Sequence, residues 1–348
     1  MHRPLSSPYM HWVKTQAAAR YSLVISGLRD YPISLLHVNF DELALSGPGA
    51  YGYRPLVEAL AEKCGVHPEM IATAQGTSMA NFLAMSALLE PGDEVLVERP
   101  GYPLIWETAQ YLGANVRFFP RHLDIDIDEL RSAVSERTRL IAITNLHNPT
   151  CAYLDSATLE KIGEIAASVN ARVLVDEVYL DLLFENKPQT AAKLGPRFVV
   201  TNSLTKAYGL SGLRCGWIVA EPALIRRIYA MNDFMSVNNA YLTDQISCIA
   251  LQQASRILAE NRELLERNRA IAADLGFTLP HAGTVVFAKL EVPVDHFCNF
   301  LRHEYETVIV PGHFFGSPDH VRIGFAGDTG VLREGLRRVR QALMAYRM

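Results

Sequence analysis

Residues 203–217 read SLTKAYGLSGLRCGW and place one lysine, Lys206, between an apolar run and a glycine-punctuated loop. The apolar run is 198–201, and Arg214 follows within the loop. Burial at the end of a strand favours the neutral, nucleophilic form of an amine, which Schiff-base chemistry needs. The planar guanidinium of an arginine binds phosphate oxygens through paired hydrogen bonds. For either residue alone, a solvated side chain on an ordinary turn explains the sequence equally well.

Short apolar runs alternate with amphipathic stretches from residue 76 up to this segment. The expected helices are 55–63, 78–89, 104–112, 127–134 and 157–169, and the expected strands are 94–97, 115–119, 140–144, 172–175 and 198–201. Strands separated by helices of about ten residues need crossover connections, so the sheet is mostly parallel and covered on both faces. We therefore predict an α/β lobe with a doubly wound sheet, which binds ligands beyond the carboxyl ends of its strands.

The pattern changes after about residue 235 and predicts a smaller α+β lobe. One long helical stretch, three short strands and a closing helix are expected there, over 242–269, 284–290, 307–310, 320–324 and 330–346. The first 40 residues show no strong period and are expected to form an arm associated with the small lobe. The predicted organisation is an arm over 1–40, a large domain over 41–235 and a small C-terminal domain over 236–348.

The composition favours an ordinary globular enzyme over a nucleic-acid or membrane protein. There are 33 Lys and Arg against 37 Asp and Glu, for a net charge of −4, so no basic surface is expected. The five cysteines are scattered and form no Cys-x-x-Cys pair, which predicts neither disulfides nor zinc and fits a reducing cytoplasm. No apolar run has the length of a signal peptide or a membrane span. The acidic run 124–129 lacks the glycine of a calcium loop and is interpreted as a helix N-cap, so no metal is expected.

Polar residues follow several of the expected strands. Asp176 comes directly after strand 172–175, and Asn148 follows strand 140–144 in NLHNPTC. An aspartate there is commonly a helix cap, and Asn-Pro is first of all a turn signal. The triplet Gly76-Thr77-Ser78 opens an expected helix, whose N-terminus suits an anion but is equally compatible with a plain cap.

The string Ser-x-x-Lys-x-x-Gly-x-x-Gly-x-Arg-x-Gly of residues 203–216 resembles the pyridoxal-phosphate lysine signature of the class I/II aminotransferases. The resemblance extends from about residue 25 to the end of the chain and implies a fold type I enzyme of the aspartate aminotransferase kind. It implies that Lys206 binds pyridoxal 5'-phosphate as an internal aldimine. The implied reaction is transamination between an L-amino acid and a 2-oxo acid, with Lys206 moving the proton.

The same resemblance assigns roles to the other polar residues. Asp176 is expected to keep a proton on the cofactor's ring nitrogen, while Tyr179 and Asn148 bond its phenolic oxygen and Tyr102 stacks on the ring. Core packing is the alternative for Tyr102. The residues expected to bind the phosphate are Gly76, Thr77, Ser78, Ser203 and Arg214.

The substrate carboxylate is expected to bind Arg322, with Gly27 and Asn148 beside it. An ion pair of Arg322 with Asp319 or Asp328 is the structural alternative. Cys151 stands where the family usually has a glycine, which puts the turn around Asn148 in question.

The resemblance also implies a homodimer in which a tyrosine reaches the partner's cofactor phosphate. The usual position is occupied by Gly47 or Pro48, and we assign the role to Tyr51. Residues 233–241 are expected to contribute to the substrate pocket. The amino donor and acceptor cannot be identified from the sequence.

Other reactions share these cofactor residues and stay open. A decarboxylase, a C–S or β-lyase, or a cyclase would carry the same set. A non-catalytic cofactor-binding regulator would carry an N-terminal DNA-binding module, and the short arm here has no basic recognition helix.

Overall fold

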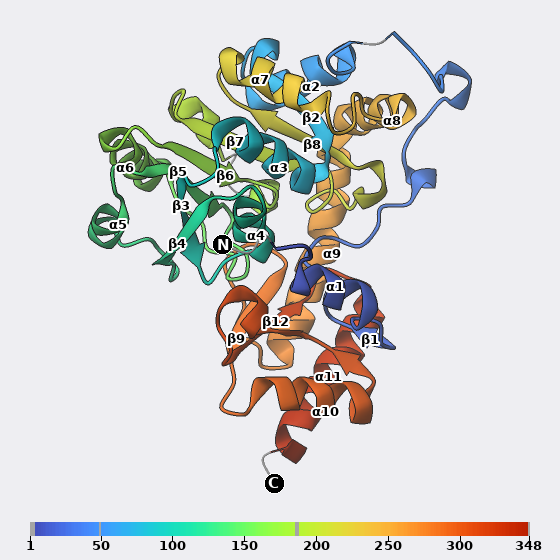
Figure 1. The fold of residues 1–348 in the computed structure, drawn as a ribbon. Helices are drawn as coiled ribbons and strands as arrows, with labels where there is room; N and C mark the ends of the chain where they lie inside the picture. The colour runs from blue at the N-terminus through green and yellow to red at the C-terminus, as the bar shows by residue number, and fades with distance from the viewer. Residues whose placement is uncertain (1–3, 49, 185–187, 347–348) are drawn as a thin grey trace.

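The computed structural model describes residues 4–48, 50–184 and 188–346, which form two unequal lobes (Figure 1). Across these residues the large lobe is built on a seven-stranded sheet with the order β2-β8-β7-β6-β5-β3-β4. The strands are β2 (Ile71–Gln75), β3 (Glu94–Arg99), β4 (Asn115–Pro120), β5 (Thr138–Thr144), β6 (Arg172–Asp176), β7 (Phe198–Ser203) and β8 (Cys215–Val219). The central pairs β4-β3, β3-β5, β5-β6 and β6-β7 are parallel, and β8 runs antiparallel to both of its neighbours. The predicted mostly parallel sheet is therefore confirmed.

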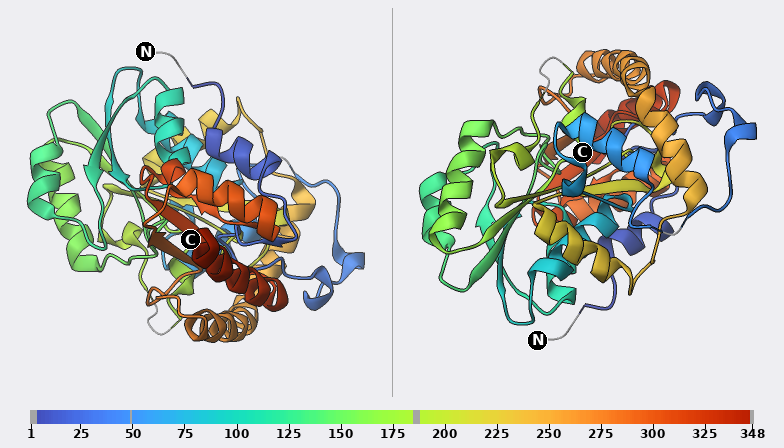
Figure 2. Two further views of the ribbon diagram at one scale, coloured as in Figure 1. Left: turned by 90° about the horizontal axis from the view of Figure 1, so that it is seen from below. Right: turned by 90° about the horizontal axis from the view of Figure 1, so that it is seen from above.

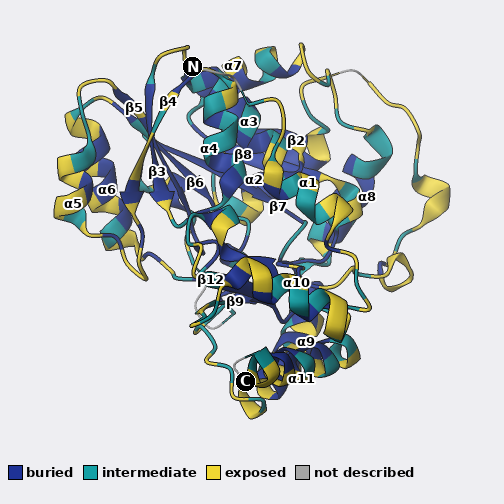
Figure 3. Cartoon of the chain, turned by 60° about the horizontal axis from the view of Figure 1, so that its bottom comes forward, coloured by how far each residue is buried: buried dark blue, intermediate teal, exposed yellow. Residues whose placement is uncertain are grey.

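Helices cover both faces of this sheet, and its strands are almost completely buried except for the edge strand β4 (Figure 3). They are α2 (Arg54–Cys64), α3 (Gly76–Leu88), α4 (Pro103–Tyr111), α5 (Ile127–Ala133), α6 (Ser156–Ser168) and α7 (Pro222–Asn232). Apolar residues of α2, α5 and α6 belong to the core on one face, and those of α3, α4 and α7 to the core on the other. In β6, Val173 and Val175 belong to the first core and Leu174 to the second, as the alternation of side chains along a strand requires.

The smaller lobe contains a three-stranded antiparallel sheet, as the predicted α+β character requires. Its order is β11 (Val310–Pro311), β12 (His320–Gly324) and β9 (Val285–Lys289), and it packs with α10 (Val294–Tyr305) and α11 (Thr329–Tyr346). The single strand expected over 307–310 is divided, because β10 (Thr307–Val308) pairs instead with β1 (Tyr21–Ser22) of the N-terminal segment. The N-terminal segment thus associates with the small lobe, as predicted.

Two helical expectations need correction. The long helix expected over 242–269 is broken at Gln253 into α8 (Tyr241–Gln252) and α9 (Ala254–Asp274). The arm contains a helix that its weak period did not predict, α1 (Pro8–Thr15), whose first turn is capped by Ser7 through a 3.3 Å bond from Met10 N. The boundaries at 40 and 235 stay a prediction, and residues 1–3 and 347–348 of the predicted arm and small domain lie outside the described residues.

Candidate active site

The polar residues predicted after the strands meet at one edge of the large sheet. Thr144 ends β5, Asp176 ends β6, and these two residues are register partners in adjacent parallel strands. Asp176 is in turn the register partner of Thr201 in β7, which leads into Lys206. Parallel strands present their carboxyl ends at a common edge. Here the N-terminal segment lies between that edge and the small lobe, since Leu28 N donates to Lys206 O and Arg29 N donates to Ala326 O.

Lys206 lies at this edge and is partly buried. Its Nζ donates to Ser26 Oγ at 3.0 Å and lies 5.9 Å from the centre of the Tyr179 ring. Burial, reinforced by the positive charge of Arg322, lowers the pKa of the Lys206 amine to about 8 against the opposing effect of Asp176. The amine is therefore biased toward the neutral form, which is the nucleophilic one.

Gly27 lies against the stem of this lysine. A Cβ at Gly27 would come within 3.0 Å of Lys206 Cδ, so the backbone approaches closely only because the side chain is absent.

Asp176 is only 3% exposed and accepts two hydrogen bonds. Asn81 Nδ2 donates to Oδ2 at 2.9 Å, and Val178 N donates to Oδ1 at 3.1 Å. Burial outweighs these bonds and raises the pKa of Asp176 to about 6. The bond from Val178 is the local contact expected if Asp176 only caps a turn. The bond from Asn81 comes from α3 and orients the carboxylate from a separate element. A buried carboxylate held in this way is suited to pairing with a cationic ring nitrogen.

The predicted phosphate residues gather at the N-terminus of α3. Gly76 has φ +76°, and a Cβ there would lie 2.4 Å from Nη2 of Arg214, which donates to Gln75 O at 3.2 Å. Ser203 is the register partner of Gly216, whose own Cβ would collide with Gly76.

Within the described chain, Thr77 Oγ1 is buried without a hydrogen-bond partner, while Ser78 is exposed on the first turn of α3. A helix N-terminus with an adjacent guanidinium and an unpaired buried hydroxyl fits a phosphate group, so these residues fit the phosphate of pyridoxal phosphate.

Arg322, on β12 of the small lobe, is 1% exposed. It donates to Asn148 Oδ1 at 3.1 Å, Tyr9 Oη at 2.8 Å and Val24 O at 3.2 Å. Among the described residues, Arg322 pairs with neither of the aspartates considered from the sequence. Asp319 pairs with His320 and Lys289, and Asp328 caps α11. Within the described chain, Nε of Arg322 has no hydrogen-bond partner. The guanidinium therefore retains capacity for a carboxylate.

Two tyrosines flank the lysine and the arginine. Tyr179 Oη donates to Ser26 Oγ at 2.8 Å, and burial raises the pKa of Tyr179, so that its hydroxyl stays a neutral donor. Tyr102 is half-buried at the start of α4, and its ring contacts the Tyr9 ring edge-on with centroids 6.1 Å apart. Tyr102 is thus at the site, with part of its surface uncovered.

Cys151 has the backbone conformation expected of the glycine that usually occupies this position in the family. Its φ is +61°, in the left-handed region that glycine favours, and its N donates to His147 O at 2.6 Å. Asn148 remains directed at Arg322. The cysteine is accommodated because Gly283 leaves room for its thiol.

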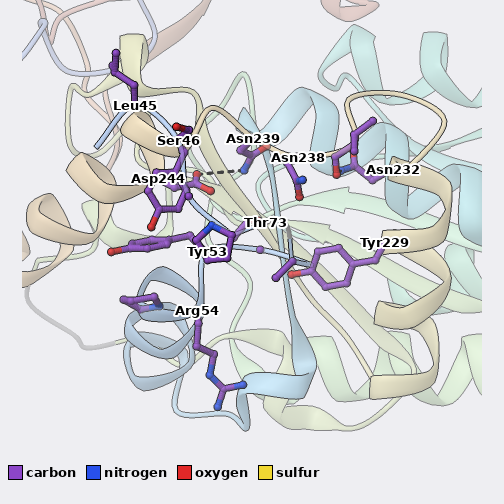
Figure 4. A pocket seen from close by; sticks show the side chains of 17 residues that line it. Leu45, Ser46, Tyr53, Arg54, Thr73, Tyr229, Asn232, Asn238, Asn239 and Asp244 are labelled. Atoms are coloured by element: carbon purple, nitrogen blue, oxygen red, sulfur yellow. Dashed lines mark hydrogen bonds between the residues drawn. The ribbon is translucent and has the colours of Figure 1, made fainter. Parts of the chain in front are cut away.

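Tyr51 lies away from this group. It is 60% exposed, donates to Asp233 Oδ2 at 3.0 Å and stacks on Tyr229. Nearby, residues 45–48, 50 and 52–55 and the loop before α8 line a pocket of about 350 Å³ (Figure 4). Asn238 and Asn239, from the segment expected to contribute to the substrate pocket, are among the residues that line this pocket.

Three residues that bond the predicted site were missed from the sequence: Tyr9, Ser26 and Asn81. Asn81 could have been noticed in the sequence, because it is a polar amide within the largely apolar segment GTSMANFLAM. In the structure its Oδ1 accepts a hydrogen bond from Thr201 Oγ1 at 2.6 Å. Tyr9 and Ser26 could not have been noticed in this way, because their partners lie more than a hundred residues away.

Residues 40–339 match the sequence model of the family described as aminotransferase class I and II. The match spans most of the chain, so the protein belongs to this family, as the lysine segment predicted. It is a family of pyridoxal-phosphate enzymes, in agreement with the predicted cofactor.

Relatives within the family carry different reactions in their names. Capreomycidine synthase of Streptomyces vinaceus is 27% identical over 364 residues, covering 97% of this chain and 94% of that enzyme. Arginine–pyruvate transaminase of Pseudomonas aeruginosa is 26% identical over 339 residues, covering 89% and 86%.

Solved structures agree on the fold. A PLP-dependent aminotransferase from Streptococcus suis matches with a TM-score of 0.92 and 27% identity over 99% of both chains. The PLP-dependent cyclase OrfR matches with a TM-score of 0.88 over 99% of both chains, and at 23% identity that likeness concerns the fold alone.

Within the described residues, no helix combines the length and the apolar character needed to cross a membrane. The same residues hold no grouping of three or more His, Cys, Asp or Glu that could bind a metal ion.

Proposed function

We propose that this protein is a pyridoxal-phosphate-dependent aminotransferase that acts on an L-amino acid and a 2-oxo acid through Lys206. The observation that carries the proposal is the partly buried amine of Lys206, whose pKa is lowered to about 8 and which senses the charges of Arg322 and Asp176. When bound, pyridoxal phosphate supplies an aldehyde that condenses with amines and a ring that withdraws electrons.

The residues of this chain then divide the work. Lys206 would hold the cofactor through its amine, and the same amine would then move the proton of the substrate's α-carbon. Asp176 would keep a proton on the ring nitrogen, and Tyr179 and Asn148 would donate to the phenolic oxygen. Arg322 binds the substrate carboxylate with two parallel N–H groups, next to the backbone of Gly27.

Phosphate binding falls to the group at the N-terminus of α3, namely Gly76, Thr77, Ser78, Ser203 and Arg214. Tyr102 supplies an aromatic face for the cofactor ring.

The experiment that tests the proposal mixes the loaded enzyme with single amino acids and no 2-oxo acid. We expect loss of the cofactor's visible band and accumulation of pyridoxamine phosphate with an equal amount of 2-oxo acid. Arginine belongs in this panel, because one relative is an arginine–pyruvate transaminase. Lys206→Ala should have neither the visible band nor the turnover. Undiminished turnover of that variant would refute the proposal.

A second reaction is favoured by the similarity to capreomycidine synthase. A cyclase, and equally a lyase or decarboxylase, would consume the amino acid without leaving pyridoxamine phosphate. The same experiment separates these outcomes, since product without pyridoxamine phosphate assigns one of them. A cofactor-binding regulator would give neither product, and a DNA-binding assay tests for it.

We further propose a cytoplasmic homodimer. Segment 31–48 extends away from the body of the molecule (Figure 2), and it exposes Phe40 and Leu45. Phe234 is likewise exposed, beside the Asp233 that accepts from Tyr51. A second copy covering this surface would explain the apolar exposure and would let Tyr51 reach the partner's phosphate.

Sedimentation equilibrium tests the dimer. Phe40→Asp combined with Phe234→Asp should shift it toward the monomer, and a monomeric wild-type chain at micromolar concentration would refute the dimer.

A further inference from the structure

Residues 24–28 connect the two cationic groups of the site. Val24 O accepts from Arg322 Nη2 at 3.2 Å, and Leu28 N donates to Lys206 O at 2.9 Å. Between them, Ser26 O accepts from Thr284 Oγ1 at 2.5 Å, which fastens the segment to the small lobe just before β9. The backbone at Ser26 is therefore held from the lysine side and from the arginine side.

The side chain of Ser26 is 6% exposed and its Oγ is shared by two groups. Lys206 Nζ donates to it at 3.0 Å, and Tyr179 Oη donates at 2.8 Å. A hydroxyl accepts through two lone pairs, so both acceptor positions of Ser26 are used. This one oxygen fixes the distance between the lysine amine and the tyrosine hydroxyl.

The charges around the amine come from three elements. Arg322 on β12 and Arg214 after β7 lower the pKa of the Lys206 amine, and Asp176 at the end of β6 raises it. Tyr179 faces the amine as a neutral group. Among the described residues, Ser26 Oγ is the side-chain atom to which the Lys206 amine donates a hydrogen bond. Removing this hydroxyl would therefore leave the protonated amine without that bond.

We propose that Ser26 is a positioning residue for Lys206: its hydroxyl accepts the free amine and holds it between Tyr179 and the arginine that binds the substrate carboxylate. This inference rests on the proposed function of the site. A lysine side chain has four rotatable bonds, so its amine can occupy many positions. A fixed acceptor restricts the amine to one of them before proton transfer. Ser26 itself neither gains nor loses a proton, because the amine takes the proton from the α-carbon and returns it.

The proposal is tested first without cofactor or amino acid. The full-length chain is treated with trinitrobenzenesulfonate across a pH range, and labelling of Lys206 is followed by peptide mass spectrometry. Ser26→Ala should lower the pH midpoint of labelling by about one unit, because a hydrogen bond that favours the ammonium form is lost. Ser26→Thr, which keeps the hydroxyl, should restore the midpoint. Ser22→Ala is the matched control, since Ser22 Oγ donates to Ala17 O at 3.1 Å, away from Lys206.

The second readout is the single-turnover rate of α-proton removal from an amino donor by the loaded enzyme. Ser26→Ala should slow this step about ten- to a hundredfold, with donor affinity nearly unchanged. A Ser26→Ala variant that matches the wild type in both assays overturns the proposal, and so does a Ser26→Thr variant that behaves like alanine. If the wild type binds no pyridoxal phosphate, the proposed function fails, whereas the labelling midpoint still reports the Ser26–Lys206 contact.

Discussion

Tyr9 Oη accepts a 2.8 Å hydrogen bond from Nη2 of Arg322 across 313 residues of sequence. The contact joins α1 of the N-terminal arm to β12 of the small lobe, and it is buried. The Arg322 guanidinium also lies 4.7 Å from the centre of the Phe315 ring. Both contacts restrict the guanidinium to the orientation in which it meets Asn148.

Tyr9→Phe removes this acceptor while keeping the ring. We expect the KM for the amino donor to rise about three- to tenfold with kcat nearly unchanged, because one hydrogen bond that orients the carboxylate-binding group is lost. Steady-state kinetics with a saturating 2-oxo acid measures this. Tyr21→Phe is the control, as the Tyr21 ring lies under Arg338 in the small lobe. An unchanged KM would show that Tyr9 does not position Arg322.

Asp176→Ala should fold and be nearly inactive. Breaking a buried ion pair with the ring nitrogen costs about 3 to 5 kcal/mol, or about two to four orders of magnitude in rate. Asp155→Ala is the control, because Asp155 only caps α6 through Thr158 N at 2.8 Å, and its loss should cost about 1 kcal/mol of stability with normal activity. Circular dichroism and single-turnover rates decide the matter. An Asp176→Ala variant that is active but less stable would show that Asp176 only stabilises the local turn.

The cofactor-free protein should lose stability between about pH 6.5 and pH 8. Burial raises the pKa of Glu177 to about 8 and that of Glu98 to about 7, whereas both titrate near 4.3 when unfolded. In this range the folded state binds more protons than the unfolded state, so unfolding becomes easier as the pH rises. Each group contributes at most about 1.4 kcal/mol per pH unit.

Urea unfolding at several pH values measures this slope, and Glu177→Gln should make it shallower. Burial lowers the pKa of His147 to about 3. This residue therefore affects the pH dependence of stability only below about pH 6.5, outside this window. A stability that rises across the window would contradict the assignment.

Gly216→Ala should weaken cofactor binding about five- to a hundredfold. The new Cβ would lie 2.4 Å from the carbonyl carbon of Gly76 and would push the first turn of α3 away from Arg214. Gly212→Ala, four residues earlier, is a control, since nothing lies within 4 Å of its Cβ position. Titration of the visible band with pyridoxal phosphate gives the dissociation constants, and equal affinity of the two variants would separate Gly216 from phosphate binding.

Cys151→Gly should leave activity intact and change stability by no more than about 1 kcal/mol. Relief of the left-handed backbone, about 1 to 2 kcal/mol, is offset by the loss of a buried thiol. Cys151→Val should be clearly destabilised, because a β-branched side chain is poorly tolerated at φ +61°. Thermal unfolding and turnover of both variants provide the check. A Gly variant without activity would mean that the thiol has a chemical role.

The sequence by itself determined the large lobe, because its elements follow from local periodicity. The runs 94–97, 140–144 and 172–175 are apolar strands between helices of the correct period, and the structure places them in one sheet. Parallel pairing then brings Thr144 and Asp176 to the same edge. The lysine segment identified the family because its residues are close in sequence.

Only the tertiary structure decided what surrounds those residues. The strands β2 and β8 were not predicted, since their short segments carry no distinctive period and acquire their conformation by pairing with each other. The helix α1 escaped prediction for a similar reason, because Tyr9 becomes buried only against the small lobe.

The bonds from Asn81 to Asp176, from Tyr9 to Arg322 and from Ser26 to Lys206 join positions 95, 313 and 180 residues apart. Local pattern reports which residue types recur along a helix or strand. Contacts at such separations arise from packing of the whole chain. A role for Lys206 could therefore be predicted from the sequence, whereas its hydrogen-bond partner Ser26 could not.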